Sequence, residues 1–402
     1  MEPVSAGLTS PKGFLASGVH CGLKAGRQAL DLGLIFSERP ATVAATFTTN
    51  RVQAAAVRLN RERVASGRAR AVVVNSGNAN ACTGARGLAD ARRTAALAAR
   101  HLKVREAEVL VASTGKIGEY LPMSKIERGV IRAVRSLGRG PRADRAVSSA
   151  ILTTDTHPKV SAVRFEVGGA QTTLAGITKG AGMIAPRMAT MLCFLTTDVA
   201  VEAPVLQKLL REAVDASYNR ISIDGHTSTN DTCICLANGA AGNRPVRPGT
   251  RAYSLLKAAL GRVTLELAHM VVRDGEGVTK FVEVMVKGAA SKADALKVAR
   301  AVAESPLVKT AIHGEDPNWG RFTSAAGYSG ARLDEAKLSC WVGDVLVFRK
   351  GLPVKGAREK AHAEMTGSDV RITLDLGLGR AETTLWTADL SEAYVRINAQ
   401  YS

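Results

Sequence analysis

The amino-acid sequence predicts an α/β fold with much antiparallel strand pairing, and three observations lead to this prediction. Short apolar runs that end in Gly, Asn or Asp alternate with amphipathic stretches of helical period. The chain has 402 residues, of which 46% are apolar, and this is enough for a large core or for two domains. It contains no run of about 18 apolar residues, so no membrane span is expected.

The individual elements follow from the same patterns. Strands are expected at 69–77, 108–114, 231–239 and 280–290. Helices are expected at 87–102, 124–138, 201–218 and 251–272. The tail, 369–390, is interpreted as a β-hairpin, and "LGRGPRADR" (137–145) is the most loop-like segment. No low-complexity linker and no internal repeat divides the chain.

Charge and the N-terminus bear on the class of protein. The 54 basic and 36 acidic residues give a net charge of +18, which raises nucleic acid as a partner. The basic residues are spread along the whole chain, aromatic residues make up only 4%, and no zinc-finger, RNP or heptad signature is present. No nucleic-acid partner is therefore expected, and the charge favours attraction of small acidic substrates. "MEPVSAGLTSPKGF" does not resemble a signal peptide, so a cytoplasmic location is expected.

A metal centre is not expected either. The six cysteines form no C-x-x-C pair next to a second pair or a histidine, and reduced core thiols explain them. Asp224, His226 and Asp231 share one polar segment, but their loose spacing fits Asx and Ser/Thr turns better than a ligand set.

Six segments are unusually rich in Gly, Asn, Thr and Asp at the ends of apolar runs. They are 75–84, 113–118, 153–159, 222–232, 273–277 and 313–321. Each alone fits ordinary turn chemistry, but six together favour a shared polar pocket. The sequence lacks a phosphate-binding loop, a G-x-G-x-x-G turn that opens a helix, and a G-x-S-x-G elbow.

The stretch "KGAGMIAPRMATMLCFLTTD" (179–198) raises a different chemistry. A threonine hydroxyl is a poor nucleophile without a nearby base. If the chain broke before Thr190, the new α-amine could be that base, because its pKa of about 7.7–8.0 lies near working pH. Ala189 is small, as such a break requires. From the residues alone, a buried strand with Thr190 as filler remains the simpler interpretation.

Nearly the whole chain resembles the ornithine acetyltransferase family, the glutamate N-acetyltransferases of arginine biosynthesis. The matching motifs occur in the family's order: "VVVNSGNANACTG", "STGKIGEYLPM", "TTDTHPK", "KGAGMIAPRMATML", "SIDGHTSTND", "GEDPNWGR" and "YVRINAQYS". The resemblance implies a four-layer α/β/β/α sandwich of the self-processing N-terminal-threonine type. It also implies a smaller C-terminal α/β subdomain at roughly 287–402.

The resemblance further implies self-cleavage between Ala189 and Thr190 into an α chain (1–189) and a β chain (190–402), assembled as α2β2. Thr190 would take the acetyl group from N2-acetyl-L-ornithine and pass it to L-glutamate. Thr114 and Gly115 match the family's oxyanion hole. The substrate-binding residues of the family match Thr153, Lys179, Thr190, Glu276, Asn398 and Ser402. No cofactor is implied, and the motifs leave open whether acetyl-CoA is a second acetyl donor.

Three positions depart from the family pattern. Arg187 stands where many members have Asn, and His226 where most have Asp. Ser402 lies four residues after Asn398 instead of the common five, which weakens its assignment as a ligand. The alternative function is an amidase or aminopeptidase with the same kind of N-terminal nucleophile. Such a hydrolase would pass the acyl group to water instead of glutamate.

Overall fold

The computed structural model describes residues 1–24, 26, 29–185 and 191–399, and these residues form two compact units. The first unit contains residues 1–180, 191–219 and 227–271, and the second contains 181–185, 220–226 and 272–399. Among the described residues, no helix combines the length and apolar composition needed to cross a membrane.

The first unit is built on a nine-stranded sheet with the order β1-β6-β7-β8-β9-β3-β4-β5, and β2 pairs with β3. The strands are β1 (Glu2–Pro3), β2 (Phe14–Val19), β3 (Leu32–Phe47), β4 (Arg68–Asn78), β5 (Val109–Lys116), β6 (Lys159–Val167), β7 (Ala170–Lys179), β8 (Leu192–Thr197) and β9 (Thr232–Ala237). Only β4–β5 and β8–β9 pair in parallel. The predicted antiparallel character is confirmed.

The long strand β3 joins two halves of this sheet. Its pairing with β4 is irregular between Phe36 and Ala41. On one side of this break β3 pairs with β2, and on the other with β9. Ile35 on β3 belongs to the same core cluster as Phe194 on β8 and Ile234 on β9. Ile35 lies in the part of β3 that pairs with β2, whereas Phe194 and Ile234 lie in the half beyond the break, so the sheet folds back on itself around a buried apolar layer.

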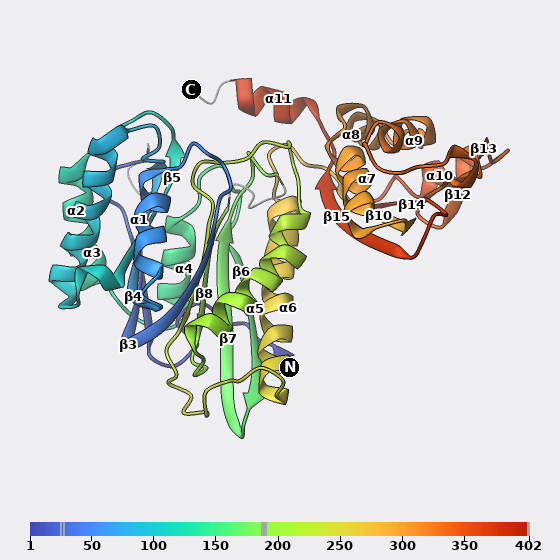
Figure 1. Cartoon of the computed structure of the whole chain (residues 1–402). Helices are drawn as coiled ribbons and strands as arrows, with labels where there is room; N and C mark the ends of the chain where they lie inside the picture. The colour runs from blue at the N-terminus through green and yellow to red at the C-terminus, as the bar shows by residue number, and fades with distance from the viewer. Residues whose placement is uncertain (25, 27–28, 186–190, 400–402) are drawn as a thin grey trace. The chain divides into compact units, whose positions relative to one another are not determined.

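Helices pack against both halves of the sheet (Figure 1). The helices of this unit are α1 (Ala55–Val64), α2 (Gly84–Leu102), α3 (Met123–Arg135), α4 (Pro141–Ala150), α5 (Ala203–Ala216) and α6 (Arg251–Arg273), with the 3₁₀ turns η1 (Glu106–Glu108) and η2 (Tyr218–Arg220). Leu34 lies on the opposite face of β3 from Ile35 and packs with α1, α2 and α3. On β7, Leu267 of α6 fills the space beside Gly176. The expected layered α/β sandwich is confirmed.

The second unit contains a mixed six-stranded sheet with the order β13-β12-β11-β14-β10-β15. Its strands are β10 (Phe281–Ala289), β11 (Ser339–Val342), β12 (Val345–Arg349), β13 (Leu352–Pro353), β14 (Asp369–Asp375) and β15 (Ala381–Ala388). Its helices are α7 (Lys292–Glu304), α8 (Pro306–His313), α9 (Trp319–Gly327), α10 (Arg358–Ala363) and α11 (Glu392–Ala399), with the 3₁₀ turn η3 (Glu335–Lys337). The apolar faces of α7, α8 and α9 share one core with the sheet.

Two local predictions were wrong. The 369–390 tail is not a hairpin, because β10 lies between β14 and β15, parallel to the first and antiparallel to the second. The connection wraps around the end of β10, where Leu378 N–H bonds to the Gly288 carbonyl at 2.7 Å. The second error concerns 137–145: α4 begins inside this segment, with Pro141 in its first turn, where a missing N–H does no harm.

Candidate active site

The parallel pair β4–β5 places the predicted oxyanion residues at one strand edge. Thr114 and Gly115 on β5 lie opposite Ser76 and Gly77 on β4. Gly115 has φ +132°, and a Cβ there would lie 2.3 Å from the carbonyl carbon of Gly77. Only glycine allows this close approach of two backbones. The buried Thr114 hydroxyl is therefore positioned by rigid strands, as a preorganised donor requires.

Lys179 ends β7 and brings a buried cation to this edge. Its side chain is only 4% exposed. The Nζ atom lies 3.4 Å from Thr114 Oγ1 and 3.9 Å from Asp155 Oδ2. A buried ammonium needs a counter-charge, and Asp155 supplies it. The structure thus places Lys179, which the resemblance assigned to substrate binding, beside Thr114, which it assigned to the oxyanion hole.

Asp155 is the centre of this cluster. Its carboxylate accepts hydrogen bonds from Lys159 Nζ (2.7 Å), Gly180 N–H (2.7 Å) and Thr153 N–H (3.1 Å). Burial acts to raise its pKa, but the charges of Lys179 and Lys159 hold the pKa well below its usual value. The carboxylate stays ionised and fixes both Thr153 and Lys179.

Lys24 is a second cation of the same cluster. Burial lowers its pKa; Asp31 and Asp155 raise it, and Lys179 lowers it further. Its Nζ donates to the Leu30 carbonyl at 2.8 Å. Lys179 beside the Thr114 hydroxyl, with the charge of Lys24 acting on Lys179, makes this edge suited to a developing oxyanion or to a substrate carboxylate.

In the second unit, the structure brings Glu276 and Asn398 together. Asn398 Nδ2 on α11 donates to Glu276 Oε2 at 2.9 Å. Glu276 is 8% exposed, and its N–H donates to the Ala181 carbonyl at 2.9 Å. A Cβ on Gly182 would lie 2.4 Å from Glu276 Oε2. The segment that begins at Ala181 therefore forms one wall around the Glu276 carboxylate.

Asp224 anchors that same segment. Its carboxylate accepts the N–H groups of Met183 (2.7 Å) and Ile184 (2.9 Å) and the hydroxyl of Tyr394 (3.2 Å). Met183 has φ +55°, which is strained for a side chain with a Cβ. His226 contributes its backbone N–H at 3.0 Å, so this contact does not depend on the imidazole.

The predicted site residues thus fall into two groups. Thr114, Gly115, Thr153 and Lys179 belong to the first unit, and Glu276 and Asn398 to the second. Ala189, Thr190 and Ser402 lie outside the described residues, as does Arg187.

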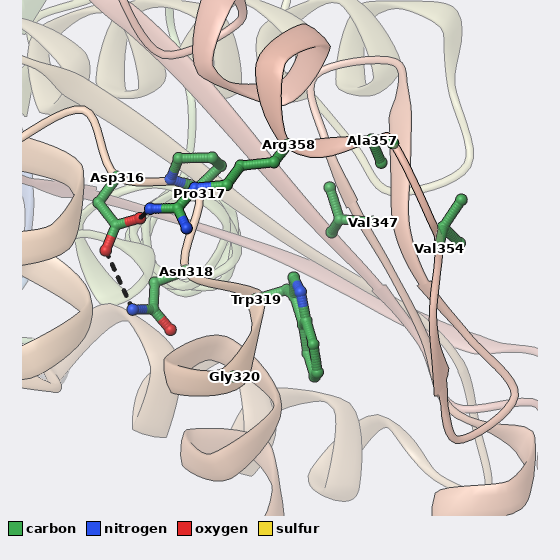
Figure 2. Close-up of a pocket in the computed structure, with 10 residues that line it drawn as sticks. Asp316, Pro317, Asn318, Trp319, Gly320, Val347, Val354, Ala357 and Arg358 are labelled. Atoms are coloured by element: carbon green, nitrogen blue, oxygen red, sulfur yellow. Dashed lines mark hydrogen bonds and ion pairs between the residues drawn. The ribbon is translucent and has the colours of Figure 1, made fainter.

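The "GEDPNWGR" motif is not part of either group. It lies between α8 and α9, where Asn318 caps α9 and donates to Asp316 at 3.0 Å. Its residues line a cavity of about 270 Å³ with Val347, Val354 and Arg358 (Figure 2). Asp316 and Arg358 pair with each other at 3.5 Å, and the arginine side chain is 84% exposed. This motif therefore has a structural explanation in its turn and helix cap.

Comparison with known proteins now decides the family. The model of the ArgJ family matches residues 15–402. The arginine biosynthesis bifunctional protein ArgJ of Symbiobacterium thermophilum is 48% identical over 402 residues, covering 100% of both chains. This chain belongs to the ArgJ family. The resemblance found in the motifs is confirmed, and with it an acetyltransferase of arginine biosynthesis.

Two further matches agree with membership of the ArgJ family. The protein of the same name from Geobacter sulfurreducens is 50% identical over 392 residues, covering 97% of this chain and 99% of that one. A solved structure of the Bacillus halodurans ArgJ protein is 38% identical with a TM-score of 0.50. The match covers 51% of this chain and 97% of the Bacillus halodurans chain.

Sequence reasoning missed Asp155 and Lys24 as members of the site. Asp155 stands inside "TTDTHPK", which was singled out, but only Thr153 was assigned a role there. Its signal was a lone acid four residues before Lys159, the basic residue at the start of β6. Lys24 ends the segment "GVHCGLK", which is similar to the family's N-terminal segment, but it is one of 54 basic residues and was assigned no role.

Proposed function

We propose that this protein transfers the acetyl group of N2-acetyl-L-ornithine to L-glutamate through an acetyl-threonine enzyme, after cutting itself between Ala189 and Thr190. The observation that carries the proposal is the Thr114–Gly115 edge with Lys179 3.4 Å from the Thr114 hydroxyl. Membership of the ArgJ family over nearly the whole length supports the choice of reaction.

The first half-reaction begins with the α-amine of Thr190, which takes the proton of the Thr190 hydroxyl as the oxygen attacks the acetyl carbonyl. Negative charge develops on the carbonyl oxygen. The Thr114 hydroxyl and the Gly115 N–H stabilise this oxyanion, and the cations Lys179 and Lys24 add to the field. Ornithine leaves with a proton, and the acetyl group stays on Thr190. In the second half-reaction the amine of glutamate attacks the acetyl-enzyme by the same route.

Substrate recognition needs one group for each charge of an amino acid. Lys179, next to Thr153, suits the α-carboxylate, and Glu276 suits an ammonium. Asn398 holds Glu276 through a 2.9 Å hydrogen bond and keeps a carbonyl oxygen as a further acceptor. The net charge of +18 favours approach of the acidic substrate glutamate. We assign Ser402 no role.

The molecular form follows from the same proposal. The α chain (1–189) and β chain (190–402) remain together as an α2β2 assembly in the cytoplasm. The match to the solved Bacillus halodurans chain covers 97% of that chain but only 51% of this one, so that chain is about half as long. This supports cleavage of the precursor into two chains. The relatives' name, bifunctional protein, supports acetyl-CoA as a second acetyl donor, with no bound cofactor.

Two measurements test the proposal. Intact-mass spectrometry should find two polypeptides, one that ends at Ala189 and one that begins at Thr190. A Thr190→Ala variant should remain a single inactive chain, and cleavage of that variant at the same bond would refute the assignment.

The second measurement separates transfer from hydrolysis. With acetylornithine alone, the wild-type enzyme should release ornithine only once per active site, and glutamate should restore turnover. Continuous ornithine release without glutamate would instead identify an N-terminal-nucleophile amidase. Acetyl-CoA in place of acetylornithine should give acetylglutamate and free coenzyme A.

A further inference from the structure

Asp389 lies between the end of β15 and the start of α11, and its carboxylate gathers four hydrogen bonds. It accepts the N–H groups of Thr279 (2.8 Å) and Lys280 (2.9 Å), the hydroxyl of Thr279 (2.6 Å) and a bond from Nδ1 of His313 (2.7 Å). The Asp389 side chain is 0% exposed. His313 ends α8 and opens the polar segment 313–321, which the proposed reaction has not used.

The carboxyl group of Asp389 is ionised. Burial acts to raise its pKa, but the hydrogen bonds from Thr279, Lys280 and His313 outweigh burial and hold the pKa below its usual value. A carboxylate only accepts hydrogen bonds, so Nδ1 of His313 carries the proton of their bond. One fixed negative charge therefore holds together the segment before β10, the end of α8 and the end of β15.

The position of Asp389 connects it to the candidate site. Thr279 lies three residues after Glu276, and Asp389 lies nine residues before Asn398. The Asp389 carboxylate therefore joins the segment that carries Glu276 to the segment that carries Asn398. The bond between Asn398 Nδ2 and Glu276 Oε2, at 2.9 Å, depends on this alignment, because a hydrogen bond weakens steeply when its angle or distance changes.

A second contact between the same two segments lies next to Glu276. The Ser391 hydroxyl donates to the Gly277 carbonyl at 2.6 Å and accepts the N–H of Tyr394 at 3.3 Å. Gly277 has φ +69°, and a Cβ there would lie 2.4 Å from the backbone nitrogen of Tyr394. Only glycine allows the first turn of α11 to approach the chain this closely. The turn after Glu276 and the start of α11 are thus packed together.

We propose that Asp389, held by His313, is a positioning residue of the transfer reaction, whose carboxylate sets the placement of Glu276 relative to Asn398. The inference rests on the proposed function, because it takes Glu276 as the group that binds the substrate ammonium. A turn and a short helix would otherwise lose conformational freedom when the substrate binds. The Asp389 cluster fixes both segments beforehand, and such preorganisation improves affinity.

The expected consequence is a change in substrate binding and not in the chemical step. Glu276 and Asn398 are assigned to the side-chain ammonium of acetylornithine, which does not react. The oxyanion donors act instead on the acetyl carbonyl. A misplaced Glu276 carboxylate would weaken the ground state and the transition state equally, and a loss of this kind raises KM while kcat stays unchanged.

The first experiment compares Asp389→Asn with a core variant of the same unit. The asparagine turns one acceptor oxygen into a group that only donates and therefore faces other donors. KM for acetylornithine should rise about tenfold, with kcat within about twofold. The control is Val342→Ala, on β11, which is 0% exposed and separated from β10 by β14. A rise in KM in the control, or none in folded Asp389→Asn, would overturn the inference.

The second experiment combines Asp389→Asn with Glu276→Gln. If Asp389 acts through Glu276, KM of the double variant should stay within about threefold of KM for Glu276→Gln alone, whereas independent effects would multiply to about a hundredfold. A multiplied KM would overturn the inference. An unchanged KM in Glu276→Gln alone would instead refute the ammonium-binding role in the proposed function, so the two failures are distinguishable.

A third comparison uses the more exposed partner and decides the matter if Asp389→Asn does not fold. The His313 side chain is 32% exposed, so its replacement leaves the core intact. His313→Ala should raise KM about fivefold, because Asp389 loses one of its donors. His313→Asn should restore most of the wild-type KM, since its amide can donate from near the Nδ1 position. An unchanged KM in His313→Ala, or equal rises in both variants, would contradict the proposal.

Discussion

The two groups of site residues differ in how they stabilise buried charge. In the first unit, Asp155 is surrounded by the ammonium groups of Lys159 and Lys179, and all three side chains are at most 4% exposed. In the second unit, the hydrogen bonds found for Lys309 Nζ among the described residues go to neutral oxygens, those of Thr387 and the Ala388 carbonyl, whereas Lys280 of the same unit pairs with Glu315 at 2.9 Å. Glu276 likewise binds the neutral amide of Asn398.

This difference separates the tasks of the two groups of site residues. Opposite charges held between strand ends make a rigid field, which is what a developing oxyanion needs. Neutral partners on a loop and a short helix hold a carboxylate less tightly and leave it available to a substrate ammonium. We therefore expect substitutions in the first unit to lower stability or kcat, and substitutions near Glu276 to raise KM.

The largest effect is expected for Asp155→Asn. The change leaves two buried ammonium groups without their carboxylate, and breaking a buried pair in this way costs about 3–5 kcal/mol. Because the folded-state pKa of Asp155 is lowered, its contribution is present above about pH 4 and is lost as pH falls further. Urea unfolding should therefore show a large gap from wild type at pH 7 that narrows towards pH 3. The control is Asp198→Asn, because Asp198 is 2% exposed and accepts the N–H groups of Thr173 (2.9 Å) and Lys12 (3.1 Å). An equal loss in that variant would contradict this.

Next in size is Thr114→Ala. Removal of one oxyanion donor should lower kcat about 10²–10³-fold while KM stays within a few-fold. The control is Thr172→Ala on β7, a buried threonine whose hydroxyl binds the Phe165 carbonyl at 2.7 Å. Steady-state kinetics of acetyl transfer make the test, and a change in KM alone would remove Thr114 from the oxyanion hole.

Lys309→Met tests the other unit. Burial lowers the pKa of Lys309 to about 8. The unfolded chain then binds more protons than the folded one between about pH 8 and 10.4, so wild-type stability should rise with pH across that window. The full rise corresponds to about 3 kcal/mol, and Lys309→Met should abolish it. Thermal unfolding at pH 7.5 and 10 measures it. The comparison is Lys280→Met, because Lys280 is a lysine of the same unit that pairs with Glu315 at 2.9 Å.

The smallest effect is expected for Glu276→Gln. The amide keeps the bond to Asn398 in one orientation but loses the charge that attracts an ammonium, so KM should rise about tenfold with kcat nearly unchanged. Glu283→Gln is the control, because Glu283 also accepts one hydrogen bond, from Trp386 Nε1 at 3.1 Å. A loss in kcat that exceeds the change in KM would place Glu276 in the chemical step.

Local patterns in the sequence were sufficient for most helices and strands. The helix expected at 251–272 is α6, Arg251–Arg273, and the strand expected at 231–239 contains β9. Amphipathic period and turn residues act over a few positions, so they can be seen without tertiary context. The motif order identified the family, because many short matches in register do not arise by chance.

Only the tertiary structure decided which distant segments meet. The insertion of β10 between β14 and β15 is invisible locally, since both strands have hairpin-like composition with a Gly-rich connection. The same holds for Asp155, a loop residue before β6 whose partner Lys179 lies at the end of β7. Sequence determines the chemical groups; desolvation and the approach of remote strands determine which of them carry unusual charge.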